Sequence, residues 1–300
     1  MTHYLTEQDV DRLLGPGDAI EAVEDSFRRL AAGTIENVPR YRVRLGDGGM
    51  LAVMSAVDTE RGLACVKTYT ATPDGASFVV ALFERGELLA VIEADRLGQL
   101  RTGAASAVAA KYLAKPGPRT LGVIGCGLQA RSQVACIREA MPGIEEVVAY
   151  CRNEKSLARF CKELKAVPGE SHRDPAGQDV VVTITTSRDP VLRGEWLRPG
   201  ALVCAAGANR LSVRELDKAV LERAAFVCCD SVADAKLESG DLVEPVEQGV
   251  LDWLEVHELQ EVVAGETPGR QSDDDIVVFK SNGLAAWDLA VAARVVELAG

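Results

Sequence analysis

The sequence of 300 residues lacks the features that several large classes of protein require. It has only three histidines and no Cys-x-x-Cys pair, so we expect no zinc or other metal site. It has no dense block of lysine or arginine, and its formal net charge of −12 disfavours binding to nucleic acid. No stretch approaches the roughly 18 to 20 consecutive apolar residues of a membrane helix.

The first residues, MTHYLTEQDVDRLL, also lack the basic and then apolar pattern of a signal peptide, so we expect a cytoplasmic protein without membrane contact. Eight cysteines are scattered along the chain, mostly inside apolar runs, and we expect them to be reduced core residues. With 47% hydrophobic and 26% charged residues the composition is globular, and the length suits about two domains.

The hydrophobic pattern changes along the chain. Residues 6–32 have a helical apolar period. Residues 40–92 form short alternating or apolar runs between turn residues, which predicts antiparallel strands. From Thr120 onward, runs of Val, Ile, Ala and Cys alternate with helical segments, which predicts a doubly wound α/β region with a parallel sheet. Residues 242–265 look helical, and a helix over 281–300 is apolar almost all round and should be buried.

The segment TLGVIGCGLQARSQ has the pattern of a loop that binds the pyrophosphate of a dinucleotide. Gly125 permits the tight turn after a buried strand, and Gly127 lets backbone amides approach the phosphates. Ala130 is small enough for close packing of helix on sheet, and the helix N-terminus carries partial positive charge. The strand before, the helix after and the strands downstream are the context that this motif needs.

The second strand of this region ends near Cys151 without the acidic residue that holds the ribose of NAD. Arg152 follows instead, which favours the extra phosphate of NADP; the alternative is NAD, with the arginine stacked on adenine. Further candidate cofactor contacts lie at strand ends, helix starts and turns. With the glycine loop, they are Thr102, Gly125, Gly127, Leu128, Gln129, Thr185, Thr186, Gly207 and Ser281.

Two cations stand where a cation is costly. Lys67 lies in the apolar strand ACVKTY, and Arg101 lies at the predicted start of a helix, where the helix dipole disfavours positive charge. One explanation is structural pairing, for example of Arg101 with Glu93 or Asp95. The other is that these cations converge on a substrate carboxylate together with an arginine of the strand PRYRVRL, where Arg40, Arg42 and Arg44 share one face. Spacing alone leaves both open.

At these residues the chain resembles the ornithine cyclodeaminase and mu-crystallin family over essentially its whole length. The matching stretches are GLACVKTY, RTGAASAVAAKYLA, TLGVIGCGLQARSQ, GANRLSVRELD, CDSVADAKLESGDL and VVFKSNGLAAWDLA. The resemblance implies a substrate-binding and dimerisation domain over 1–113, an antiparallel half-barrel, completed by a C-terminal helix over 281–300. It also implies a Rossmann domain over 114–280 between them, and a homodimer whose half-barrels join. Lys67, Arg101 and either Arg40 or Arg42 would grip the α-carboxylate of the substrate.

Cyclodeaminases of this family use two carboxylates on the distal amine of ornithine. The matching positions here are Asn209 and, by counting, Ala52, and neither can act as a base. We therefore predict an NAD(P)H-dependent imine reductase or amino-acid dehydrogenase acting at the α-carbon, with Lys67, Arg101 and Asn209 as catalytic residues. Candidate substrates are cyclic ketimines, pyrroline carboxylate, iminosuccinate and alanine. Cyclodeamination and non-enzymatic binding of NADP and a small ligand are the alternatives.

Overall fold

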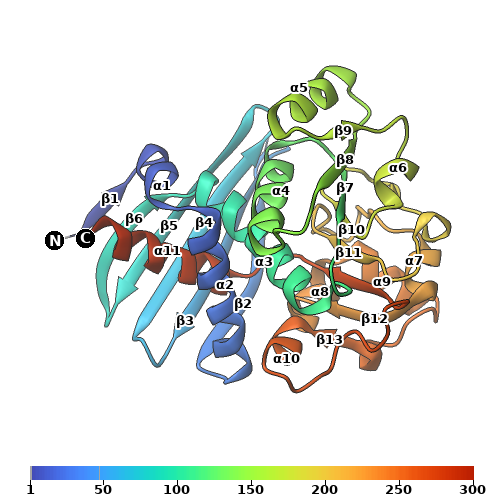
Figure 1. Cartoon of the computed structure of the whole chain (residues 1–300). Coiled ribbons are helices and arrows are strands. Elements are labelled where there is room, and N and C mark those ends of the chain that lie inside the picture. The colour runs from blue at the N-terminus through green and yellow to red at the C-terminus, as the bar shows by residue number, and fades with distance from the viewer. Residues whose placement is uncertain (1, 47) are drawn as a thin grey trace. The chain divides into compact units, whose positions relative to one another are not determined.

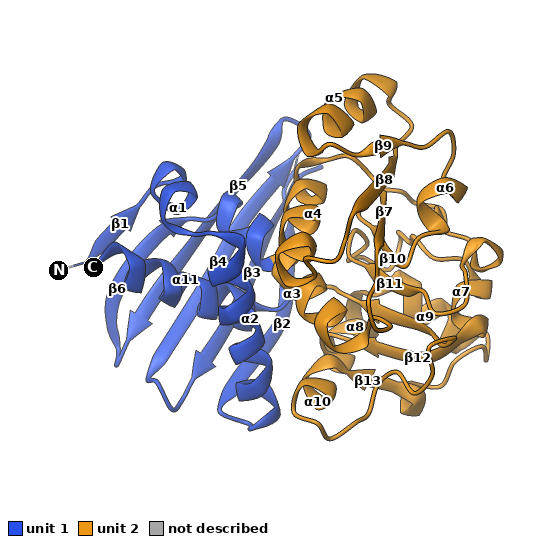
Figure 2. Cartoon of the chain, viewed as in Figure 1, with its two compact units in different colours: residues 1–101, 283–300 blue, residues 102–282 orange. Residues whose placement is uncertain are grey.

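The computed structural model describes residues 2–46 and 48–300, and the chain divides into two compact units (Figure 2). Unit 1 contains residues 1–101 and 283–300, and unit 2 contains residues 102–282. Each unit has a sheet of its own. Helix α3 (Asp95–Leu113) begins in unit 1 and continues in unit 2. The assignment of substrate binding to unit 1 and of dinucleotide binding to unit 2 stays a prediction.

Unit 1 is built on a six-stranded sheet in the order β1-β6-β5-β4-β3-β2, in which only the β1–β6 pair is parallel (Figure 1). The antiparallel strands confirm the expectation from the alternating runs. The strands are β1 (His3–Leu5), β2 (Ile35–Arg44), β3 (Met50–Asp58), β4 (Leu63–Thr72), β5 (Gly75–Glu84) and β6 (Glu87–Glu93). The helices are α1 (Glu7–Leu13), α2 (Pro16–Ala31) and α11 (Ala285–Ala299).

The helical pattern of residues 6–32 belongs to two helices rather than one. Helix α1 ends at Leu13, and α2 begins at Pro16 with Gly15 as its N-cap. Proline has no amide hydrogen to continue a helix but fits the first helical position well, which explains the break.

Helix α11 covers one face of this sheet and contacts strands β2 to β5 as well as α2. Its Trp287 is fully buried and meets Phe27 of α2 edge to face at 5.5 Å. The expectation of a buried, all-round apolar helix is therefore confirmed for α11. On the covered face, one row across the sheet runs through Met54, Lys67 and Val80, which are paired in register.

The other face of the sheet is apolar and exposed. Successive residues of β4 face opposite sides of the sheet, so Val66, which precedes Lys67, lies on this other face. Val66 is 38% exposed. Tyr4, Val38 and Tyr41 are more than half exposed, at 64%, 53% and 70%. An antiparallel sheet usually presents polar side chains on a face that stays in water, so this face differs from the usual pattern.

Unit 2 is a doubly wound domain whose eight strands are all parallel, in the order β13-β12-β14-β11-β10-β7-β8-β9. The predicted fold class is confirmed. The strands are β7 (Thr120–Ile124), β8 (Glu146–Tyr150), β9 (Val167–Pro168), β10 (Val180–Thr183), β11 (Leu202–Ala205), β12 (Ala224–Cys229), β13 (Val256–Glu258) and β14 (Ile276–Lys280). The helices are α4 (Leu128–Ala140), α5 (Glu154–Leu164), α6 (Arg173–Ala176), α7 (Lys218–Arg223), α8 (Val232–Glu238), α9 (Gly240–Glu247) and α10 (Leu259–Val263).

The helical interpretation of residues 242–265 is only partly right. Helices α9 and α10 lie there, but β13 lies between them and pairs with Val227–Cys229 of β12. A strand of three residues is too short to show a hydrophobic period, so no pattern in the sequence indicates β13.

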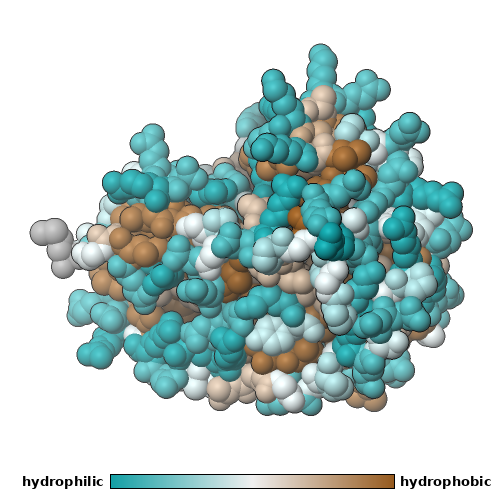
Figure 3. All heavy atoms as spheres, in the orientation of Figure 1, coloured by the Kyte–Doolittle hydropathy of each residue, from teal (hydrophilic) through white to brown (hydrophobic). Residues whose placement is uncertain are grey.

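Hydrophilic side chains predominate on the face shown in Figure 3, with separate apolar patches between them. Within the described ranges, none of the helices combines the length and the apolar character needed to cross a membrane.

Candidate active site

Lys67 is buried in unit 1 and held by a carboxylate from the far end of the chain. Its side chain is 2% exposed, and Nζ donates a hydrogen bond to Oδ1 of Asp288 at 2.7 Å. Gly98 of α3 makes room for the amine, since a Cβ at that position would lie 3.3 Å from Nζ. The register of β4 aims Lys67 at the helix-covered face, where α11 supplies Asp288.

Arg101 converges on the same carboxylate oxygen. Its Nε donates to Oδ1 of Asp288 at 3.2 Å, and its guanidinium lies over the ring of Trp287 at 5.7 Å. Oδ2 of Asp288 is buried and accepts no hydrogen bond from the residues described. One carboxylate therefore serves two buried cations, so this trio carries a net positive charge when all three are ionised.

Two sequence-based arguments about Arg101 are wrong. Helix α3 begins at Asp95, so Arg101 lies in its second turn and not at its N-terminus, where the dipole would act. The nearby acid Glu93 is used elsewhere, because it accepts hydrogen bonds from the Tyr4 hydroxyl and from the Glu7 amide. The pairing partner of Arg101 is Asp288, which no local pattern indicated.

Arg40 is the strand arginine that lies beside this pair. A bulge between Val38 and Tyr41 turns it toward the covered face, where Nη2 donates to the Gly283 carbonyl at 3.3 Å. A Cβ at Gly283 would lie 2.7 Å from Nη1 of Arg101 and 3.3 Å from Nη2 of Arg40, so both guanidinium groups approach this one glycine. Arg42 lies further along β2, paired in register with buried Ala52, and Arg44 is exposed.

The electrostatics suit Lys67 to proton transfer. The pKa of Lys67 is lowered to about 8, mainly because the amine is buried, and the positive charges of Arg101 and Arg40 contribute to this lowering. Asp288 opposes this by stabilising the ammonium form. The amine can thus both hold and release a proton near neutral pH, as a general acid or base requires.

The glycine loop in unit 2 has the geometry that binding of a pyrophosphate needs. Gly125 has a φ of +112°, and a Cβ there would lie 2.3 Å from the Ile184 carbonyl oxygen, so only glycine fits. Gly127 is the N-cap of α4 and no side chain caps its first amides. Gln129 also has a buried Oε1 that accepts no hydrogen bond from the described residues. Backbone amides without a side-chain cap at a helix N-terminus fit a bound phosphate group.

Thr185 and Gly207, which we predicted as cofactor contacts, are fixed by a buried carboxylate that we did not predict. Glu215 is completely buried and accepts hydrogen bonds from the Thr185 amide at 2.6 Å and from the Gly207 amide at 2.7 Å. It also accepts from the hydroxyls of Thr183 and Thr185 and from the Ala208 amide. These bonds tie the ends of β10 and β11 to the loop that carries Asn209.

A buried lysine compensates this carboxylate. Lys280 Nζ lies 3.4 Å from Oδ2 of Asp241, and Oδ1 of Asp241 accepts the Glu215 amide at 2.7 Å. Burial raises the pKa of Glu215, with the charge of Asp241 as the next cause, while Lys280 lowers it. The network holds strand ends and loops in place at the edge where ligands of parallel sheets bind.

The other predicted cofactor residues lie at separate places in unit 2. Leu128 is 63% exposed at the start of α4, and Arg152 is exposed after β8. Thr186 is exposed after β10. Ser281 is buried, and its hydroxyl donates to Oδ2 of Asp230 at 3.3 Å. Thr102 is buried in α3, and its carbonyl accepts from Gln133 of α4 at 3.3 Å.

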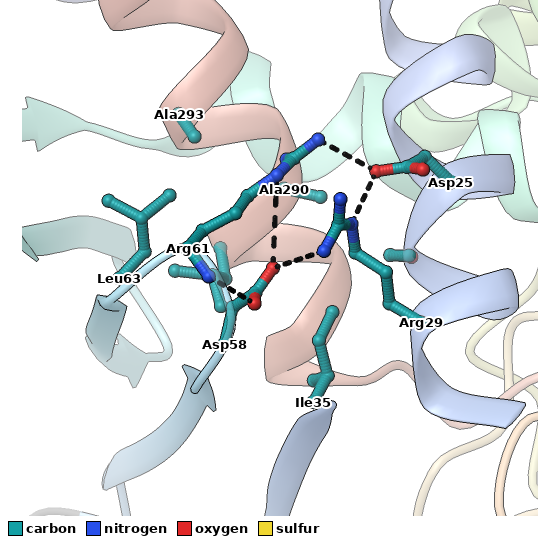
Figure 4. Close-up of a pocket in the computed structure, with 10 residues that line it drawn as sticks. Asp25, Arg29, Ile35, Asp58, Arg61, Leu63, Ala290 and Ala293 are labelled. Carbon is teal, nitrogen blue, oxygen red and sulfur yellow. Dashed lines mark hydrogen bonds and ion pairs between the residues drawn. The ribbon is translucent and has the colours of Figure 1, made fainter. Parts of the chain in front are cut away.

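A hollow in unit 1, away from Lys67 and Arg101, is lined by a cluster of ion pairs (Figure 4). Asp25 accepts from Arg29 and from Arg61, both at 2.9 Å, and Arg29 also approaches Asp58 at 3.5 Å. Both guanidinium groups are thus occupied, and the cluster joins α2 to the β3–β4 turn. In the ranges that the structure describes, no group of three or more His, Cys, Asp or Glu side chains could hold a metal ion.

A glycine loop fit for a dinucleotide and a buried cationic cluster are the two sites that a dinucleotide-dependent enzyme acting on a carboxylate needs. Comparison with known proteins agrees. The chain belongs to the ornithine cyclodeaminase/mu-crystallin family, whose model matches residues 2–299. It is 37% identical over 307 residues to the alanine dehydrogenase of Archaeoglobus fulgidus, and the match covers 99% of this chain and 94% of that protein.

Two solved structures are also similar. One is Δ1-pyrroline-2-carboxylate reductase from Thermococcus litoralis in complex with NADH and L-proline, with a TM-score of 0.94, 31% identity, and coverage of 99% of this chain and 97% of the other. The second is the iminosuccinate reductase of Paracoccus denitrificans in complex with NAD+, with a TM-score of 0.92, 29% identity, and coverage of 99% and 96%. These relatives confirm the predicted class, a nicotinamide-dependent oxidoreductase acting on amino or imino acids.

Proposed function

We propose that the protein reduces the C=N bond of a small α-imino acid or cyclic ketimine carboxylate with NAD(P)H, or oxidises the corresponding amino acid. The observation that carries the proposal is the convergence of Lys67 and Arg101 on one oxygen of buried Asp288, with Arg40 beside them. A carboxylate that joins this cluster gains charge-assisted hydrogen bonds, each of about 1.5–3 kcal/mol.

In this proposal Arg101 and Arg40 bind the substrate carboxylate and fix the orientation of the α-carbon. The bound dinucleotide supplies the hydride or accepts it. Lys67 donates a proton to the substrate nitrogen in the reductive direction, and neutral Lys67 removes it in the oxidative direction. Asp288 holds the amine in place and stabilises its charged form. Asn209 contributes a polar contact and no base.

On the cofactor side, NADP is the preferred dinucleotide in our proposal. Arg152 is exposed directly after β8, and the strand end Tyr150-Cys151 offers no carboxylate to bind a ribose hydroxyl. His172 lies near Arg152, since the charge of Arg152 contributes to the lowered pKa of His172, after burial. A phosphate at this place would meet the positive charge of Arg152.

We also propose that the protein is a homodimer. The exposed apolar face of the unit 1 sheet, with Tyr4, Val38 and Tyr41, supports this, because such a face is usually covered by another surface. A second copy would bury the same face on both protomers.

The test is a panel of initial rates. NADH and NADPH are each combined with preformed cyclic imines, and with α-keto acids plus ammonia, and oxidation of the cofactor is followed. Turnover that is lost in Lys67→Met and Arg101→Met, with cofactor binding kept, supports the proposal. Binding of the dinucleotide without any turnover would identify a binding protein. Release of ammonia and proline from ornithine would instead show that Asn209 and Ala52 do not prevent cyclodeamination.

The same panel tests a narrower hypothesis. Arg42 and Arg44 share the face of β2 with Arg40, so a substrate with a second carboxylate, such as iminosuccinate, would find further cations there. Arg42→Ala and Arg44→Ala should then lower the rate with iminosuccinate more than the rate with a monocarboxylate imine. Equal losses for both substrates would contradict a second carboxylate site.

A further inference from the structure

Arg131, in the first turn of α4, uses its whole guanidinium group on fixed partners. Nη1 donates to the Gly127 carbonyl at 2.9 Å and to the Cys126 carbonyl at 3.4 Å. Nε donates to both carboxylate oxygens of Glu163 on α5, each at 2.9 Å, and Nη2 lies 2.8 Å from Oε2 of the same carboxylate. The guanidinium also lies over the ring of fully buried Phe160, at 5.6 Å from its centroid. One side chain therefore ties the glycine loop to α5.

The two carbonyls that Arg131 holds belong to the peptide planes of the glycine loop. A peptide unit is planar and trans, so its carbonyl and its amide hydrogen point in opposite directions. The Cys126 carbonyl shares its plane with the Gly127 amide, and the Gly127 carbonyl shares its plane with the Leu128 amide. A guanidinium that fixes both carbonyls therefore also fixes the direction of both amides. These amides are the donors that a pyrophosphate at this loop would meet.

The two glycines of the loop differ in how firmly their surroundings hold them. Gly125 is tightly packed, since a Cβ there would lie 2.3 Å from the Ile184 carbonyl oxygen. At Gly127, apart from its chain neighbours, no described residue has a heavy atom within 4 Å of the place that a Cβ would take. Glycine has more backbone freedom than any other residue, so an unpacked glycine needs another restraint to stay in one conformation. The hydrogen bonds from Arg131 are such a restraint.

We propose that Arg131 is a positioning residue of the dinucleotide site, which aims the Gly127 and Leu128 amides at the pyrophosphate. It acts through the loop and does not touch the reacting atoms. This inference rests on the proposed function, because it takes the glycine loop as the place where the pyrophosphate binds.

Glu163 holds the guanidinium in the orientation that this role needs. Hydrogen bonds from Arg131 are the largest cause that keeps the pKa of Glu163 below its usual range, so the carboxylate is charged at neutral pH. Because this charge offsets that of Arg131, direct attraction between Arg131 and the phosphates is not the main effect expected. The planar fork of arginine matters instead, since it serves a carboxylate and two carbonyls at once, whereas lysine offers one flexible ammonium.

The experiment measures dinucleotide binding by Arg131→Met through the fluorescence of NADH and of NADPH. The Kd should rise about tenfold for both cofactors, because the pyrophosphate is common to them. Arg152→Ala, in contrast, should act on NADPH and change NADH little. In turnover assays the loss should fall on the KM for the dinucleotide rather than on kcat. Arg131→Lys keeps the charge without the fork, so it should recover only part of the affinity.

Two further variants separate positioning from general stability. Arg138→Met is the matched control, because Arg138 is on the same helix and donates to the Leu164 carbonyl of α5 at 2.9 Å, away from the loop. Its Kd values should not change. Glu163→Gln leaves the Arg131 side chain in place but loosens its hold, so it should raise both Kd values. Combined with Arg131→Met it should add little, since the two residues act through one contact.

Equal Kd values in Arg131→Met and wild type, an equal rise in Arg138→Met, or full recovery in Arg131→Lys would overturn the proposal. If the wild type binds neither cofactor, the proposed function fails, and hydrogen exchange without ligand still decides whether Arg131 restrains the loop. Amides of residues 125–131 should then exchange faster in Arg131→Met than in Arg138→Met. Equal exchange in the two variants would overturn the restraint.

Discussion

Nζ of Lys67 lies 2.7 Å from Oδ1 of Asp288, although 221 positions separate the two residues in the sequence. Arg101 donates to the same oxygen. A buried cation that shares its counter-ion with a second cation has one negative charge too few for full compensation. This deficit is the physical reason why a carboxylate substrate would bind there, and several measurable consequences depend on it.

The rate of imine reduction should fall above pH 8. Burial lowers the pKa of Lys67 to about 8, so the protonated donor is lost through that pH. The kcat/KM for reduction should be level below pH 8 and fall about tenfold per pH unit above it, while kcat/KM for amino-acid oxidation should rise to a plateau. Rates measured in both directions check this. A level reductive profile up to about pH 10, close to the ordinary pKa of lysine, would remove Lys67 from proton transfer.

Replacement of Asp288 by asparagine should shift that profile to lower pH. Asp288 raises the pKa of Lys67, so its neutral amide leaves the ammonium less stable. Two buried cations also lose their partner, which should lower the free energy of unfolding by about 3–5 kcal/mol. The matched control is Asp18→Asn. The Asp18 carboxylate pairs with Arg294 at the surface, so its loss should lower the free energy of unfolding by only about 0–1 kcal/mol. An unshifted profile in Asp288→Asn would show that Asp288 does not tune the amine.

Gly283→Ala should weaken substrate binding and leave dinucleotide binding unchanged. The new methyl group would lie 2.7 Å from Nη1 of Arg101 and would displace the guanidinium groups. Gly283 also has a φ of +92°, so the substitution costs about 1–2 kcal/mol of backbone strain. Gly249→Ala carries similar strain, at +71°, but meets nothing within 4 Å. A KM that rises in Gly283→Ala but not in Gly249→Ala would show that the contact with the guanidinium groups is the cause. An equal rise in both variants would show that backbone strain is the cause instead.

Arg152→Ala should weaken binding of NADPH by about tenfold or more and change binding of NADH little. The reason is the loss of a charge-assisted bond to the extra phosphate, worth about 1.5–3 kcal/mol. Titration of both cofactors measures this preference. Arg119→Ala is the control, because Arg119 is exposed at the amino end of β7, the end opposite the glycine loop. Equal losses for both cofactors would indicate stacking on adenine instead.

Glu215→Gln should destabilise unit 2 and weaken dinucleotide binding. Five donors face the carboxylate, and an amide offers only one oxygen and adds two hydrogens of its own. Each buried donor left without a partner costs about 1–3 kcal/mol, so thermal unfolding should occur several degrees lower. Glu222→Gln, in an exposed pair with Lys218, is the control. A Glu215→Gln protein with unchanged melting and unchanged Kd would show that the network is dispensable.

The sequence predicted best what is encoded locally. The glycine loop was recognisable because Gly125, Gly127 and Ala130 stand in a fixed spacing between a buried strand and a helix. The alternating strands of unit 1 and the apolar strands of unit 2 were recognisable for the same reason. Lys67 attracted attention because a charged residue interrupts an apolar strand, and the structure buries it.

What the sequence could not predict depends on contacts between distant segments. Helix α3 begins at Asp95 because the carboxylate of Glu7 accepts the amides of Asp95 and Arg96, at 2.6 and 2.8 Å. Asp288 could be paired with Lys67 only once α11 was known to return to the β4 strand. Glu215 had no sequence signal, because it stands between the charged residues Arg214 and Asp217. Its five donors come from two separate segments, residues 183–185 and residues 207–208.

The return of α11 to unit 1 also orders the assembly of the nascent chain. Translation produces Lys67 and Arg101 first, then all of unit 2, and only afterwards the helix that brings their counter-ion. Unit 2 is continuous and can acquire its parallel sheet while the sheet of unit 1 still lacks the helix that covers it. Unit 1 is therefore the last of the two units to be completed, although its strands are synthesised first.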